Sequence, residues 1–79
     1  MTKQEFLNFV DELNQLRDDY RFWRDKKHAF ELRQDNAKTE TGKYRLGRKV
    51  LNCQYYEDKC YKEYKEFKRE FAQAIGVTE

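Results

Sequence analysis

A run of apolar side chains at alternating steps of three and four residues constrains this fold most. In the first half of the chain it comprises Phe6, Phe9, Leu13, Leu16, Tyr20, Trp23 and Phe30, with Lys27 in the one missing place. Side chains at this spacing form one stripe of an α-helix, the seam through which coiled coils pair. Because the chain contains no proline, nothing interrupts such a helix. The pattern predicts a helix over about residues 3–35, which Thr2 and Glu5 begin with a capping box.

The second half repeats the pattern. Its seam is Leu46, Val50, Cys53, Glu57, Cys60, Tyr64, Phe67, Phe71 and Ala74. The spacing predicts a helix over about residues 43–75 that stops at Gly76, since glycine commonly ends helices. Gly47 falls inside its first turns and weakens them, which leaves room for a bend or fraying there.

The segment between the two seams, residues 36–42, is polar and contains good turn formers, so it is predicted to be a loop. We expect Asn36 to end the first helix in the left-handed conformation, and Thr39 or Thr41 to cap the second helix. A loop this short makes the helices antiparallel neighbours. Seam residues whose numbers sum to 80 then face one another, as Phe9 does with Phe71.

These features predict an all-α fold, a coiled-coil-like antiparallel hairpin forming one domain over residues 1–79. Two helices alone leave much apolar surface uncovered. The apolar residues outside the seams are Leu7, Val10, Phe22, Leu32, Leu51, Tyr55, Tyr56, Tyr61 and Ile75. We favour a dimer in which two hairpins pair into a four-helix bundle and so cover these residues. Docking on another protein and a compact three-helix domain, broken at Gly47 or within residues 35–42, are the alternatives.

Lys27 and Glu57 are the two charged residues in seam positions, about one helical turn apart in this register. One interpretation is a buried acid or amine with a shifted pKa. We favour an ion pair that fixes register and antiparallel orientation, because no second carboxylate or nucleophile joins the two residues.

The sequence offers little for catalysis. It contains no serine, one histidine and no glycine-rich phosphate loop, so we expect neither an enzyme nor a bound cofactor. Cys53 and Cys60 lie about 10 Å apart along a helix, too far for an intramolecular disulfide. They are interpreted as core thiols, since a metal site would need more ligands than His28 supplies. Free thiols without a visible secretory signal predict a cytoplasmic protein, and no apolar run reaches the ~18 residues of a membrane span.

Two groups of residues are candidates for binding. Tyrosine is common at interface centres, and the predicted partner-binding residues are Tyr55, Tyr56, Tyr61, Phe22 and Leu51. Basic side chains collect near the loop. Residues 21–49 hold ten Lys and Arg against four Asp and Glu, a net charge of +6. Because the whole chain carries +2, the remaining residues carry −4. The predicted anion- or nucleic-acid-binding residues are Lys43, Tyr44, Arg45, Arg48, Lys49, Arg33 and Lys38, among which the tyrosine could stack on a base.

The hairpin outline and the opening residues Met1–Glu5 resemble the plasmid repressor-of-primer hairpins, dimeric four-helix bundles that bind RNA. The resemblance implies that a hairpin of this size can act on nucleic acid. Our first hypothesis is a non-enzymatic protein that occupies a surface of a protein partner, as an inhibitor, adaptor or accessory factor, of a kind encoded by phages and mobile elements. The second is nucleic-acid binding through the basic hairpin tip. The third is a structural oligomer that scaffolds a larger assembly.

Overall fold

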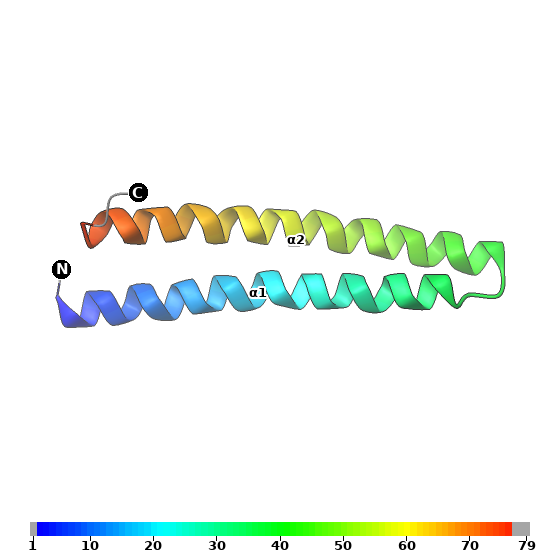
Figure 1. Cartoon of the computed structure of the whole chain (residues 1–79), viewed down its shortest axis with the longest axis horizontal. Coiled ribbons are helices and arrows are strands. Elements are labelled where there is room, and N and C mark those ends of the chain that lie inside the picture. Colours follow the sequence, from blue (N-terminus) through cyan, green and yellow to red (C-terminus); the bar gives the residue numbers. More distant parts are fainter. Residues whose placement is uncertain (1, 77–79) are drawn as a thin grey trace.

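The protein is a long hairpin of two α-helices (Figure 1). The computed structural model describes residues 2–76, in which α1 spans Lys3–Asp35 and α2 spans Glu40–Ala74. The helices lie antiparallel along their whole length, and no strand occurs within residues 2–76. The predicted all-α hairpin is confirmed. The three-helix alternative is wrong, because α2 continues without a break through Gly47 and the chain turns only once.

Both helices begin at the threonines that the sequence singled out. The Thr2 hydroxyl accepts a hydrogen bond of 3.1 Å from the backbone N–H of Glu5, whose carboxylate accepts from the backbone N–H of Thr2. The Thr39 hydroxyl accepts from the N–H of Gly42 at 3.0 Å. Because Thr39 rather than Thr41 is the cap, α2 starts at Glu40, earlier than the pattern predicted, and the loop is correspondingly shorter.

The helices end in two different ways. Gly76 has a φ of 80°, the left-handed conformation that glycine adopts without strain, as expected after α2. The expectation of a left-handed Asn36 is wrong, since its φ is −93°. Its backbone N–H and its side-chain amide both donate to the carbonyl of Leu32. Asn36 therefore provides hydrogen bonds to a carbonyl at the end of α1 while its backbone stays in the right-handed conformation.

Aromatic contacts between the helices give the register. Phe9 lies against both Phe67 and Phe71, with ring centroids 5.5 Å and 5.8 Å apart. Further along, Tyr20 lies 5.0 Å from Tyr61. The numbers of these pairs sum to values close to 80, so the helices pair within one turn of the predicted register. The resulting rod measures 57 × 21 × 14 Å.

The core of the rod is thin. Cys53, at 3% exposure, is the one apolar residue that is buried among those described, and Glu57 is the one charged residue, at 9%. The remaining seam side chains are partly exposed, and at the terminal end Phe6 and Ala74 are exposed outright. Two helices can cover each other's seam along one side only, so much apolar surface stays in contact with solvent.

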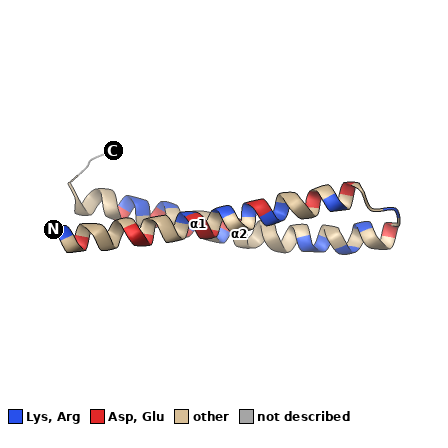
Figure 2. Cartoon of the chain, turned by 90° about the horizontal axis from the view of Figure 1, so that it is seen from below, with Lys and Arg blue, Asp and Glu red and all other residues tan. Residues whose placement is uncertain are grey.

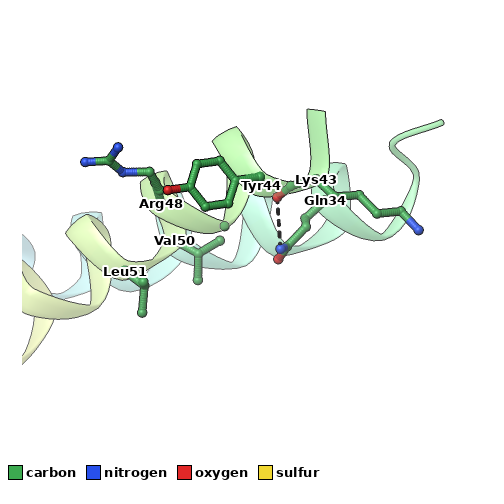
Figure 3. Close-up of a pocket in the computed structure, with 7 residues that line it drawn as sticks. Gln34, Lys43, Tyr44, Arg48, Val50 and Leu51 are labelled. Atoms are coloured by element: carbon green, nitrogen blue, oxygen red, sulfur yellow. Dashed lines mark hydrogen bonds between the residues drawn. The ribbon is translucent and has the colours of Figure 1, made fainter. Parts of the chain in front are cut away.

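Gly47 makes room for a contact between the helices, and α2 continues through it without a break. The side-chain amide of Gln34 on α1 donates to the backbone carbonyl of Lys43 on α2 at 3.1 Å (Figure 3). A Cβ atom at Gly47 would lie 2.8 Å from the Gln34 amide nitrogen. The glycine therefore accommodates this hydrogen bond between the loop ends of the helices.

This arrangement makes the effect of Gly47→Ala depend on Gln34. Alanine stabilises a helix interior by about 1 kcal/mol relative to glycine, and a lost hydrogen bond costs a similar amount. We expect Gly47→Ala to leave the free energy of unfolding of the wild-type chain nearly unchanged, and to raise it by about 1 kcal/mol in a Gln34→Ala background. Urea unfolding of the wild type, the two single variants and the double variant measures these free energies. A gain of about 1 kcal/mol from Gly47→Ala in the wild-type background would contradict the expectation.

Candidate functional site

Exposed aromatic side chains meet midway along the rod, on one side of the seam. Trp23 of α1 stacks on Tyr56 of α2, with ring centroids 4.7 Å apart and an interplanar angle of 23°. Phe22 packs edge-on against Trp23, and Tyr55 packs edge-on against Tyr56. Phe22 and Tyr55 are nevertheless 57% and 63% exposed. The hairpin thus holds the aromatic groups together without covering them.

A groove of about 360 Å³ adjoins this stack. Its lining residues are Trp23, Lys26, Phe30, Lys49, Asn52, Cys53 and Tyr56. We call these residues together with Phe22 the Trp23 face. The lining includes no carboxylate, so the face presents positive charge around an aromatic floor.

The two lysines of the Trp23 face and the neighbouring Arg33 lie over its rings. The Lys26 ammonium is 5.3 Å from the centre of the Trp23 ring and 5.5 Å from that of Phe22. The Lys49 ammonium and the Arg33 guanidinium lie 5.4 Å and 5.9 Å from Phe30. Such contacts contribute about 0.5–1 kcal/mol each at exposed sites and leave the charge available to a ligand.

The structure divides the predicted partner-binding residues. Phe22, Tyr55 and Tyr56 come together around Trp23. Tyr61 follows Tyr56 by five residues, about 140° around the helix, and contacts Tyr20 on the other side of the seam. Leu51, at 69% exposure, lines a separate groove near the loop.

The predicted basic residues also divide into groups. Lys49 belongs to the Trp23 face and lies against Phe30, and Arg33, outside the groove lining, contacts the same ring. Lys43, Tyr44 and Arg48 line the loop-end groove of about 400 Å³, in which Tyr44 is 67% exposed (Figure 3). Lys38 lies in the connecting loop and Arg45 is exposed on α2.

Sequence reasoning missed Lys26 and Phe30 as members of a site. The available signal was their spacing from Trp23, which places all three on one side of α1. This spacing alone does not define a site. The site is defined only by the contacts of these α1 residues with Lys49 and Tyr56 of α2 in the folded hairpin.

The Lys27 ammonium lies 2.6 Å from a carboxylate oxygen of Glu57 on the opposite helix. The same ammonium donates a hydrogen bond of 2.9 Å to the side-chain oxygen of Gln54, whose amide donates to Asp58 at 2.8 Å. The side chains of Lys27 and Glu57 are only 13% and 12% exposed. The predicted seam ion pair is therefore present, and it ties α1 to α2 at one register.

The ion pair predicts an alkaline loss of stability. The pKa of Lys27 is raised above its ordinary value of 10.5 by the hydrogen bond to Glu57, against the opposing effect of burial. A group whose pKa is raised by folding stabilises the folded chain fully below its unfolded pKa, and this contribution is lost as the pH rises through the folded pKa.

We expect the wild-type chain to lose free energy of unfolding above about pH 10.5 relative to Lys27→Met/Glu57→Met. Both chains keep all the tyrosines and cysteines, so the difference between them isolates Lys27. Urea unfolding between about pH 8 and 11.5 measures it. A difference that stays constant across this range would contradict the role of the ion pair.

Both cysteines are free thiols. Burial raises the pKa of the Cys60 thiol, and the neighbouring Glu63 and Asp19 carboxylates raise it further. Cys60 is therefore a protonated thiol at neutral pH, as a packing residue would be. Across residues 2–76, no three His, Cys, Asp or Glu side chains gather where they could hold a metal ion.

Neither α1 nor α2 contains an apolar stretch of the length that a membrane span requires. Comparison with known proteins found no matching protein family, no matching curated protein and no matching solved structure.

Proposed function

We propose that this chain is a non-enzymatic helical interaction protein that acts by occupying a surface of a partner protein, as an inhibitor, adaptor or accessory factor. The observation that carries the proposal is the stack of Trp23 on Tyr56, flanked by exposed Phe22 and Tyr55. Tryptophan and tyrosine dominate the energetic centres of protein interfaces, because they bury a large area at a small cost in side-chain entropy.

The charge of the Trp23 face supports a partner of particular chemistry. Lys26 and Lys49 flank the aromatic floor, and neither forms an ion pair among the described residues. A partner surface with an apolar centre and carboxylates around it would match this face. Charge complementarity of this kind selects the partner and raises the association rate.

A photoreactive benzophenone side chain at position 22 tests the proposal in the native cell. We expect it to form a covalent adduct with another protein chain, and Trp23→Ala/Tyr56→Ala in the same chain to lower the yield at least tenfold. The control places the probe at His28, which has a similarly exposed side chain but lies about 120° around α1. Equal labelling from both positions would contradict the proposal.

Nucleic-acid binding near the loop is the second candidate. It is supported by Lys43 and Arg48 beside the exposed ring of Tyr44, and by Arg33 and Lys49 against Phe30. Cations combined with accessible aromatic rings are what single-stranded nucleic acid binds, through its phosphates and stacked bases.

The salt dependence of binding to a labelled single-stranded oligonucleotide tests this candidate. Each phosphate contact contributes about −0.7 to the slope of log K against log salt. We expect Arg45→Glu/Arg48→Glu to make the slope shallower by at least about 1.4. The control is Lys62→Glu/Arg69→Glu, which changes the net charge equally on the outer side of α2. Weak binding without salt dependence would eliminate this function.

A further inference from the structure

We infer that the occupant of the Trp23 face is a second copy of this chain, packed antiparallel with Trp23 and Tyr56 beside the two-fold axis. The inference rests on the proposed function, because it names the partner of that same face. Three observations carry it: the order of charges along the face, the absence of ion pairs to these charges among the described residues, and the amount of exposed surface.

A charged stripe beside the seam changes sign at the level of Trp23. Every seventh residue of α1 belongs to it: Glu5, Glu12, Asp19, Lys26 and Arg33. Seven residues make about two helical turns, so these side chains share one side of α1. That side carries the Trp23 face, because Lys26 lies over the Trp23 ring.

The matching stripe on α2 consists of Lys49, Tyr56, Glu63 and Glu70. Tyr56 and Lys49 place it on the same side of the hairpin, since both line the Trp23 groove. Because α2 runs antiparallel to α1, both stripes are basic toward the loop and acidic toward the termini. Figure 2 colours all the described Lys and Arg residues blue and the Asp and Glu residues red. On the other side of the seam the equivalent α1 residues, Val10, Arg17, Arg24 and Glu31, show no such division.

The charges of these stripes form no ion pairs among the described residues. The ion pairs of the described chain join Arg17 to Asp18, Arg24 to Asp25, Lys27 to Glu57 and His28 to Glu31. None of them includes a stripe residue. Coiled coils use charges that flank a seam in this way to set the orientation of a partner helix.

A two-fold axis across the rod at Trp23 pairs opposite charges. It lays α1 of one copy against α1 of the other in reverse, so residues whose numbers sum to about 45 face each other. Asp19 then meets Lys26 of the second copy, and Glu12 meets Arg33. The same rotation sets Glu70 of α2 against Arg45 and brings Phe22 onto Trp23. A parallel arrangement would instead place the basic halves together.

The exposed surface of the hairpin fits a dimer. The chain exposes 6394 Å², whereas a folded monomer of 9.8 kDa exposes about 5,200 Å². The excess is larger than the ~800 Å² that each partner contributes to a stable interface. The aromatic stack would form the centre of this interface and the charged stripes its rim.

Sedimentation equilibrium of the full chain tests the inference. A salt concentration of about 50 mM is used, because more salt would screen the attraction between the charged stripes of the two copies. We expect a dimer. Lys26→Glu/Arg33→Glu makes the α1 stripe wholly acidic, and Glu12→Lys/Asp19→Lys makes it basic from residue 12 to residue 33. Each variant alone should raise the dissociation constant at least tenfold. An equimolar mixture of the two should recover dimers, because α1 then meets an α1 of opposite charge.

The control is Lys62→Glu/Arg69→Glu, a reversal seven residues apart on the exposed outer side of α2, which should leave the dissociation constant within twofold. Circular dichroism checks the fold of each variant, and Lys26→Gln/Arg33→Gln, expected to weaken the dimer less, replaces any variant that unfolds.

A wild-type chain that stays monomeric at about 100 µM overturns the inference. If the probe at position 22 then still labels a foreign protein, the proposed function stands without it; if the probe labels no protein, both fail. The antiparallel arrangement is overturned if neither charge reversal weakens the dimer. It is also overturned if mixing the two charge-reversed variants does not restore dimers.

Discussion

The ion pair of Lys27 with Glu57 favours one register of the two helices over its neighbours. Its two charges are nearly buried between helices that otherwise pack through partly exposed rings. A slip of one helical turn would separate the charges and leave both without a partner, which is costly at this degree of burial. The stack of Trp23 on Tyr56, one turn along α1, depends on the same register.

The thinness of the core follows from the two-helix architecture. Each seam is covered along one side, so large aromatic residues remain partly in solvent even where they touch across the hairpin. A chain of this size gains little stability from such a core. Association through the Trp23 face would bury the rings of Phe22 and Tyr56, which the hairpin leaves exposed. This links the energetics of the fold to the function we propose.

Helix capping and seam spacing were predictable from the residues, because each depends on neighbours within a few positions. The loop is shorter than predicted, because Thr39 caps α2 and the helix begins at Glu40. Thr2, Thr39 and Gly76 act as their local chemistry predicts. Asn36 does not, since its side chain bonds to Leu32 and removes the need for a left-handed residue. Gly47 looked like a weak point in α2, but only the position of Gln34 on the other helix shows why a small residue belongs there.

The sequence by itself determined two long helices, their antiparallel pairing and the ion pair at their seam, because periodicity and charge are properties of a single chain segment. Only the tertiary structure decided which exposed residues share a face. Tyr56 and Tyr61 lie five positions apart on different sides of the α2 seam and contact different rings of α1, Trp23 and Tyr20, and Lys49 meets Phe30 although many residues separate them. Such contacts depend on the rotation of one helix relative to the other, which packing alone sets.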